Sequence, residues 1–244
     1  RWRPDWRIGR SASARWARRR EDRQRGRTHV NVFKGTALVT GAAGGIGRAT
    51  AMRLAELGVH VVVNSASSVE AGQQVAAALA TEGAYVQADI SDQAQGQRLI
   101  DETIKKFGRL DILVNNAGWT TLVPHGDLDG LTDEIFDKTF KVNVYGTWWL
   151  TKAAIPHLHK SDDGNVVNIT SIAGVRPLGS SMAYAMTKAA LNHMTLLLAK
   201  SHGPIRFNAV APGLVQTPWT QDWGVMHEFV AQAAPLKRSA YASD

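Results

Sequence analysis

Short runs of apolar residues alternate along the chain with longer segments whose apolar positions recur every three or four residues. Each short run has the length of a buried strand, and each longer segment has the period of an amphipathic helix. The predicted strands lie near residues 36–40, 59–64, 84–88, 110–115, 164–170 and 205–210. The predicted helices lie near residues 46–57, 68–82, 93–107, 132–158 and 181–202. This alternation predicts an α/β fold with a doubly wound parallel sheet and right-handed crossovers.

A glycine-rich turn follows the first predicted strand and precedes the first predicted helix. It reads T-G-A-A-G-G-I-G from Thr40 onward and places glycines at Gly41, Gly45 and Gly47. Glycines let a backbone pass close to a pyrophosphate, and a helix N-terminus offers free N–H groups and a positive dipole end. The spacing differs from the commoner Gly-x-Gly-x-x-Gly, and a flexible turn is the alternative. The strand before it and the helix after it favour a dinucleotide site.

Polar residues also follow two of the later predicted strands. The sequence N-N-A-G occupies residues 115–118, directly after one apolar run, and Ser171 follows another. In an open α/β sheet, ligands bind in the crevice at the carboxyl ends of the strands, so side chains placed there are candidates for ligand contacts. Taken singly, each is more typical of an ordinary turn or cap.

Tyr184 and Lys188 stand four residues apart in the sequence Y-A-M-T-K, within the last predicted helix. That spacing puts both side chains on one helix face, one turn apart. A lysine ammonium beside a phenol favours the phenolate, so we expect the pKa of Tyr184 to fall from its usual ~10 toward neutrality. Such a tyrosine can act as a general acid or base. On its own the pair is more often an ordinary surface contact.

Together and in this order, the glycine-rich turn, N-N-A-G, the strand-end serine and Y-x-x-x-K resemble the short-chain dehydrogenase/reductase family. The resemblance runs from about Lys34 to the C-terminus and is strongest to 3-oxoacyl-thioester reductases. It implies a single Rossmann-like domain that transfers a hydride between a nicotinamide coenzyme and a ketone or secondary alcohol.

The resemblance also implies four catalytic residues, Asn143, Ser171, Tyr184 and Lys188. Tyr184 is expected to protonate the developing alkoxide in carbonyl reduction and to act as the base in alcohol oxidation. Lys188 is expected to lower the tyrosine pKa and to bind the nicotinamide ribose. Ser171 is expected to hold the substrate oxygen. Asn143 is expected to hold a water that links Lys188 to solvent.

Further residues are expected, by the same resemblance, to contact the coenzyme. Asp89 stands where relatives contact the adenine ring, and the loop 212–217 stands where they hold the nicotinamide carboxamide. The full set of expected coenzyme contacts is Thr40, Gly41, Gly45, Ile46, Gly47, Asn64, Ser65, Asp89, Ile90, Asn115, Ala117, Gly118, Tyr184, Lys188, Pro212, Gly213, Val215 and Thr217.

The end of the second predicted strand bears on the choice of coenzyme. NAD-binding units carry an acid there that binds the ribose 2′-hydroxyl, and this chain has none. Asn64, Ser65 and Ser67 could instead donate hydrogen bonds to a 2′-phosphate. Against this, Gly44 stands where NADP-preferring relatives often carry a basic residue, and Arg48 lies one turn further on. We expect NADP(H) in preference to NAD(H).

The positive charge of the chain is concentrated in residues 1–33. This segment holds eleven arginines against three acids, a net +8, which leaves −1 for residues 34–244 out of the total of +7. It has no sustained apolar stripe, so we expect it to be disordered. Binding to nucleic acid or anionic membranes and an organelle transit role are the functional alternatives. A non-native extension is favoured, because the segment lies upstream of the usual start of relatives and lacks a leading methionine.

The composition removes several classes of function. The chain has no cysteine, which excludes disulfides and thiolate metal sites, and no carboxylate pattern accompanies its eight histidines, so we expect no metal site. No apolar run reaches the roughly 18–20 residues of a membrane span. We expect a cytoplasmic enzyme. Two rival functions are disfavoured: a nucleotide-binding regulator without turnover, and a nucleic-acid-associated protein acting through the arginine-rich segment.

The C-terminal part departs from the family pattern. Relatives continue beyond Arg238 with a helix and a seventh strand, whereas this chain stops at Asp244, so we expect a domain over 34–244 whose sheet lacks its last strand. Relatives form homodimers or homotetramers, and we expect the short C-terminus to weaken such assembly here. Trp148 and Trp149 are candidates for the subunit interface, with core packing as the equal alternative.

The segment 217–224 predicts the character of the substrate pocket. It contains Trp219 and Trp223 and no cation that could anchor a carboxylate or phosphate, so we expect a mobile aromatic lid. The expected substrate is a small-molecule ketone or secondary alcohol, with 3-oxoacyl thioesters slightly favoured.

Overall fold

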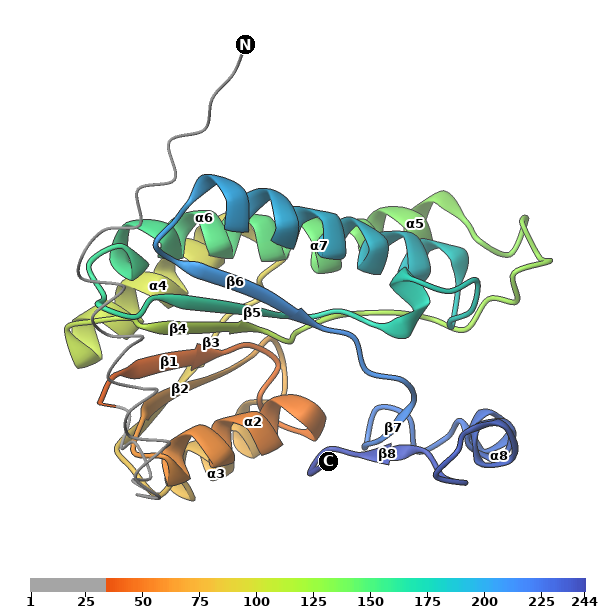
Figure 1. The fold of residues 1–244 in the computed structure, drawn as a ribbon, viewed down its shortest axis with the longest axis horizontal. Helices are drawn as coiled ribbons and strands as arrows, with labels where there is room; N and C mark the ends of the chain where they lie inside the picture. The colour runs from red at the N-terminus through yellow and green to blue at the C-terminus, as the bar shows by residue number, and fades with distance from the viewer. Residues whose placement is uncertain (1–33) are drawn as a thin grey trace, which may run out of the picture. The chain divides into compact units, whose positions relative to one another are not determined.

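Six parallel strands form the central sheet of residues 34–244, the part of the chain that the computed structural model describes (Figure 1). Their order across the sheet is β3-β2-β1-β4-β5-β6. The strands are β1 (Thr36–Val39), β2 (His60–Ser65), β3 (Gly83–Gln87), β4 (Ile112–Asn115), β5 (Asn165–Ile169) and β6 (Arg206–Val210). Each lies where an apolar run predicted it, so the doubly wound α/β fold is confirmed. The expectations for residues 1–33 lie outside the described residues.

The order of the strands reverses at β1, which lies between β2 and β4. Ala37 of β1 pairs with Val61 on one side and with Ile112 on the other. Leu38 and Val39 are fully buried, because helices cover both faces of the sheet. Ligands of open α/β sheets bind beyond the carboxyl ends of the strands at such a reversal. The fold therefore points to the ends of β1 and β4 as the place of a site.

Helices form a layer on each face of the sheet (Figure 1). The helices are α2 (Gly45–Glu56), α3 (Val69–Ala77), α4 (Gln93–Phe107), α5 (Asp133–Phe140), α6 (Thr147–Leu158), α7 (Met182–Ser201) and α8 (Gly224–Ala233). One apolar core lies under α2 and α3 and includes Ala51, Ala55 and Val75. A second core lies under α4, α6 and α7 and includes residues such as Leu99 and Leu150. No helix of residues 34–244 is long and apolar enough to cross a bilayer.

Two of the predicted helices have different bounds in the structure. The single helix expected over 132–158 consists of α5, a π-helical turn (Lys141–Gly146) and α6. A π-turn keeps the chain helical, so the apolar pattern does not reveal it. The helix expected over 68–82 ends at Ala77. The chain beyond it is held against β2 by the Thr81 hydroxyl, which donates to the Val59 carbonyl over 2.6 Å.

The C-terminal part contains structure that the sequence pattern did not predict. After β6 the chain forms β7 (Val215–Gln216), then α8, and then β8 (Ala240–Tyr241), which pairs with β7 in a second, two-stranded parallel sheet. Strands of two residues give no readable alternation. Within residues 34–244 no strand pairs with the outer side of β6, which forms the edge of the main sheet and leaves Val210 half exposed.

Candidate active site

Thr40, at the end of β1, joins the glycine-rich turn to the N-N-A-G segment. Its hydroxyl donates to the Val114 carbonyl over 3.3 Å and accepts from the backbone N–H groups of Asn116 and Ala117 over 3.0 Å each. The Asn116 side chain returns the contact by donating to the carbonyls of Thr40 and Gly41. The two motifs are 70-odd residues apart in the sequence, and these bonds hold them together at one edge of the sheet.

The glycines of the turn are required by its backbone. Gly41 and Gly45 have φ values of 61° and 53°, in the left-handed region that side chains disfavour. A methyl group on Gly47 would lie 2.5 Å from the Gly41 carbonyl oxygen and from Asn116 Nδ2. No side chain of the described residues caps the N-terminus of α2, which leaves its first N–H groups to a ligand. This cradle fits a pyrophosphate, which such a helix end binds through N–H groups and dipole.

Asn143 lies inside the π-helical turn and is fully buried. Its Oδ1 accepts from the Trp119 N–H over 2.7 Å, and its Nδ2 donates to the Trp119 carbonyl and to the Thr187 hydroxyl. A methyl group on Gly118 would lie 3.3 Å from Asn143 Oδ1 and 3.7 Å from Lys188 Nζ. Asn143 and Lys188 therefore both lie close to Gly118, and the Asn143 amide holds the chain that follows Gly118.

Tyr184 stands in the first turn of α7, whose N-terminus is fixed by Ser181. The Ser181 hydroxyl accepts from the Tyr184 N–H over 3.2 Å and thereby caps the helix. The Tyr184 phenol lies near the side chain of Ser171, which stands just beyond the end of β5 and acts to lower the pKa of the phenol. Ser171 and Tyr184 thus lie close to each other near the carboxyl end of β5.

Lys188 lies one helical turn after Tyr184 and is almost completely buried. Its Nζ lies 5.5 Å from the centroid of the Tyr184 ring and donates to the Ile169 carbonyl over 2.8 Å. Burial lowers the pKa of Lys188 to about 8. Burial also raises the pKa of Tyr184, and the nearby Ser171 side chain offsets only part of this rise. The expectation of a lowered tyrosine pKa is therefore wrong for this structure, because desolvation of the phenolate outweighs the lowering effect of Ser171.

Two of the three side chains expected to bind a 2′-phosphate at the end of β2, those of Asn64 and Ser65, are buried, whereas Ser67 is exposed. Asn64 is buried, and its Nδ2 donates to the carbonyls of Val86 and Ala88. The Ser65 hydroxyl donates to the Ser68 carbonyl and is hydrogen-bonded to the hydroxyl of Tyr85. These hydrogen bonds join the end of β2 to β3 and to the start of α3.

The remaining expected coenzyme contacts are divided between the surface and the core. Asp89 accepts from the Ser91 N–H, and Ile90 is buried in the core under α4 and α6. Asn115 donates to Thr151 and Asn168 in a buried network. The loop after β6 contacts two parts of the site. Its Pro212 and Gly213 pack beside Ile172, while its Val215 is buried and its Thr217 lies against Gly45.

Several residues of the site were missed by reasoning from the sequence. Besides Trp119, Ser181 and Thr187, they include Thr120 and Ser180, whose hydroxyls lie 2.6 Å apart and join the loop after β4 to the segment before α7. Ser181 carried a readable signal, since a serine just before a predicted helix is a typical N-cap. The others pair with residues distant in the sequence, which no local pattern reveals.

A separate cavity of about 450 Å³ lies at the opposite, amino-terminal edge of the sheet. Its wall includes the carboxylate of Asp111, which accepts from the Thr36 N–H, from the Arg109 guanidinium and from the Ser161 hydroxyl. Asp111 therefore serves to hold these segments of the fold together. We place the candidate active site at the carboxyl edge of the sheet instead. Within residues 34–244 no group of three or more His, Asp or Glu side chains could hold a metal ion.

Comparison with known proteins agrees with this geometry. Residues 35–227 match the family model for short chain dehydrogenases. The chain is 50% identical, over 85% of both sequences, to a protein of Streptomyces violaceoruber named as ketoacyl reductase 2 of the granaticin polyketide synthase. It is 38% identical to a 3-oxoacyl-[acyl-carrier-protein] reductase of Synechocystis, over 83% of this chain and 82% of that one. Its fold resembles a Brucella melitensis 3-ketoacyl-(acyl-carrier-protein) reductase complexed with NADH, with a TM-score of 0.80 and 30% identity over 86% of each chain.

Proposed function

Since the chain belongs to the short-chain dehydrogenase/reductase family and is an NAD(P)-dependent oxidoreductase, we propose that it reduces a ketone to a secondary alcohol with NADP(H). A 3-oxoacyl thioester is the favoured substrate. The observation that carries the proposal is the meeting of Ser171, Tyr184 and Lys188 at the sheet edge that also holds the glycine cradle.

The residues of the site can perform the proton transfer that this reduction needs. The nicotinamide, when bound, supplies the hydride. Tyr184 donates its proton to the alkoxide that develops on the substrate, and Ser171 donates a hydrogen bond to the same oxygen. Lys188, in its charged form, stabilises the phenolate left on Tyr184. In the oxidative direction the same residues act in reverse, with Tyr184 as the base. The water-holding role of Asn143 stays a prediction.

The preference for NADP(H) is supported by charge and exposure at the end of β2. No acid stands there to repel a 2′-phosphate, while Ser67 and Ser68 are exposed on the loop that follows. Arg48 is exposed on α2 and lies after the glycine turn. We propose these three residues as the phosphate donors in place of the buried Asn64 and Ser65.

The preference for an apolar acyl substrate is supported by the walls of the site. Exposed apolar side chains occur in the segments expected to line it, at Leu122, Val175, Leu178 and Met182. The rings of Trp219 and Trp223 lie tilted against each other, with their centroids 6.3 Å apart, in the segment proposed as a lid. Two similar proteins are named as ketoacyl or oxoacyl reductases, which favours the same substrate class.

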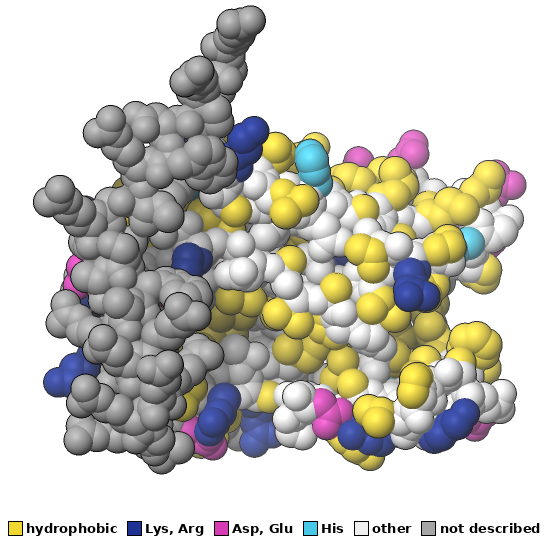
Figure 2. All heavy atoms as spheres, in the orientation of Figure 1, with side chains coloured by type: hydrophobic (Ala, Val, Ile, Leu, Met, Phe, Trp, Pro, Cys, Tyr) yellow, Lys and Arg dark blue, Asp and Glu magenta, His cyan; other side chains and the backbone are white. Residues whose placement is uncertain are grey.

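Assembly into a homodimer or homotetramer is supported by apolar side chains on the outer helices. Tyr145 and Trp148 are exposed near the start of α6, and Leu196 and Leu197 are exposed on α7. Figure 2 shows hydrophobic side chains distributed over the face of the molecule that α7 and β6 occupy. The cytoplasmic location stays a prediction from the sequence.

The deciding experiment is a fluorescence titration of the chain with NADPH and with NADH, followed by an assay of 3-oxoacyl thioester reduction. We expect NADPH to bind more tightly and to give the higher kcat/KM. A higher kcat/KM with NADH would reject the coenzyme preference. Binding without turnover of any ketone would support the alternative of a nucleotide-binding regulator. The nucleic-acid alternative depends on residues 1–33, which lie outside the described residues.

A further inference from the structure

The side chain of His227 joins helix α8 to the loop before it and to the chain after it. The Nε2 atom of His227 lies 2.9 Å from the Thr220 carbonyl oxygen, and its Nδ1 lies 2.7 Å from the hydroxyl of Ser239. A carbonyl can only accept, so Nε2 carries a proton and donates it to Thr220. The imidazole therefore bridges the start of α8 to both the loop 217–220 and the chain just before β8.

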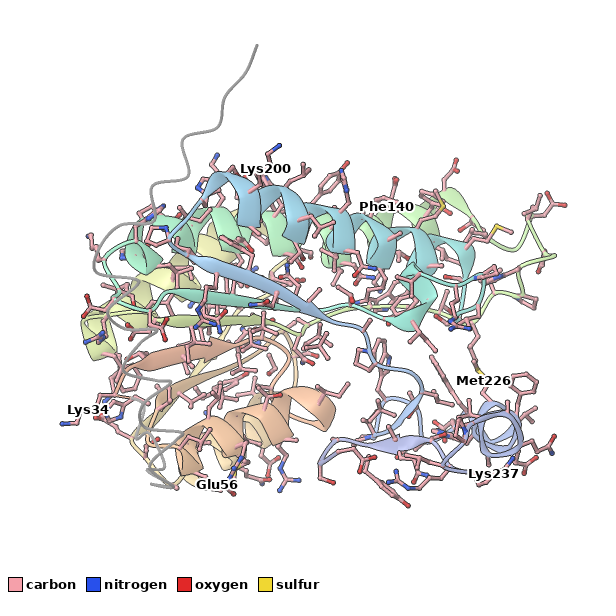
Figure 3. The ribbon with its side chains drawn as sticks, viewed as in Figure 1. Lys34, Glu56, Phe140, Lys200, Met226 and Lys237 are labelled. Carbon is pink, nitrogen blue, oxygen red and sulfur yellow. The ribbon has the colours of Figure 1, made fainter. Side chains whose placement is uncertain are left out.

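This bridge matters because α8 has little else to hold it. None of its residues is buried, and Val225 and Phe229 are largely exposed. Figure 3 shows this C-terminal segment with its side chains, including Met226 on α8 and Lys237 beyond it. Apolar burial is the usual source of attachment for a short helix. Without it, the polar contacts of His227 determine where the helix and its loop lie, with Ser239 and Thr220 both buried beneath them.

Thr220 connects His227 to Thr217 by hydrogen bonds. The Thr220 hydroxyl donates to the Val215 carbonyl over 2.6 Å and accepts from the Thr217 N–H over 3.3 Å. The Thr220 N–H donates back to the Thr217 carbonyl over 3.0 Å. These bonds close a tight turn in which Thr217 cannot move independently of Thr220.

Thr217 in turn lies against the glycine cradle. A methyl group on Gly45 would be 3.3 Å from Cβ and Cγ2 of Thr217, so the loop and the start of α2 are in close contact. We propose that His227 is a positioning residue which, through Thr220, holds Thr217 at the edge of the coenzyme site. This inference rests on the proposed function for its effect on coenzyme, but the network itself is independent of the reaction.

The test compares three variants of the whole chain. In His227→Ala the bridge is lost, and we expect the Kd for NADPH to rise by about tenfold, which equals about 1.4 kcal/mol. The KM for NADPH should rise in parallel while kcat changes by less than about threefold. A glutamine can also donate to Thr220 and accept from Ser239, so His227→Gln should recover most of the affinity. The control is His193→Ala, which removes an exposed histidine of α7 and should bind like the wild type.

A second measurement keeps the network testable apart from the reaction. Chymotrypsin cleaves after aromatic residues, and Trp219 and Trp223 flank Thr220. We expect faster cleavage at these sites in His227→Ala than in His193→Ala, with or without coenzyme. Equal cleavage rates, or an unchanged Kd for NADPH in His227→Ala, would overturn the inference. A wild-type chain that binds neither NADPH nor NADH would instead reject the proposed function, and the cleavage rates alone would then decide about His227.

Discussion

Lys188 Nζ donates a 2.8 Å hydrogen bond to the carbonyl oxygen of Ile169, so a buried cation of α7 is held by the neutral end of β5. No carboxylate of residues 34–244 forms a salt bridge with this ammonium. An unpaired buried charge is costly, which is why burial lowers the pKa of Lys188 to about 8. The charge that supports Tyr184 is therefore present at neutral pH and lost under mildly alkaline conditions.

This pKa predicts how ketone reduction depends on pH. As the pH rises through about 8, Lys188 loses its proton and no longer stabilises the phenolate that forms on Tyr184. The raised pKa of Tyr184 keeps the phenol itself protonated in this range. We expect kcat/KM for the ketone to fall above pH 8, in a profile measured at constant ionic strength. Lys188→Met should be slow and lack this inflection, and a flat wild-type profile up to pH 9.5 would contradict the assignment.

Removing the phenol of Tyr184 tests the proton donor directly. We expect Tyr184→Phe to lose at least about 10²–10⁴-fold in kcat, because the developing alkoxide has no positioned acid. The Kd for NADPH should stay near the wild-type value, since the ring is retained. Tyr145→Phe provides the matched control, as it removes the hydroxyl of an exposed tyrosine. Comparable turnover in Tyr184→Phe and Tyr145→Phe would rule out Tyr184 as the acid.

A pair of glycine substitutions tests the cradle. In Gly47→Ala the added methyl group meets the Gly41 carbonyl oxygen and Asn116 Nδ2 at 2.5 Å, so the turn must deform. We expect coenzyme binding to be lost and the free energy of unfolding to fall by about 1–3 kcal/mol. In Gly96→Ala, inside α4, no atom lies within 4 Å of the added group. That variant should be more stable by about 0.5–1 kcal/mol and bind coenzyme normally. Calorimetry and titration check both, and normal binding by Gly47→Ala would refute the cradle.

The lowered pKa of Asp111 predicts that the protein loses part of its stability in acid. Burial acts to raise its pKa, but hydrogen bonds from Arg109, Ser161 and the Thr36 N–H outweigh burial and hold the pKa below its usual value. A lowered folded pKa gives stability that is present above the unfolded value of about 3.9 and lost as the pH falls through the folded value.

We expect Asp111→Asn to be less stable than the wild type by about 1–3 kcal/mol at neutral pH. The difference should shrink as the pH falls from about 4 toward the lowered folded pKa of Asp111, because the wild-type carboxylate is protonated first in the unfolded and then in the folded state. Urea unfolding at a series of pH values measures this, with Asp101→Asn as an exposed control. A stability difference independent of pH would show that the charge of Asp111 is not responsible.

The strands and most helices followed from the sequence, because buried parallel strands and amphipathic helices leave a local pattern. The catalytic candidates could be placed for the same reason, since Ser171 and Tyr184 stand at fixed offsets from a strand end and a helix start. Burial could not be predicted in this way. It reversed the expected direction of the Tyr184 pKa and turned Asn64 inward, since both effects depend on neighbours that are distant in the sequence.

The junction of β1 with β4 has a consequence for how the protein folds. Strands β1 to β3 and strands β4 to β6 are each built from one continuous stretch of chain, and only the connection through α4 passes between them. Three residue pairs join the two halves, and Asp111 and Thr40 fasten them at either end. Pairing of β1 with β4 is thus the folding step that joins residues far apart in the sequence. The crevice exists only after that union, so any ligand bound in it favours the completed sheet over a half-assembled one.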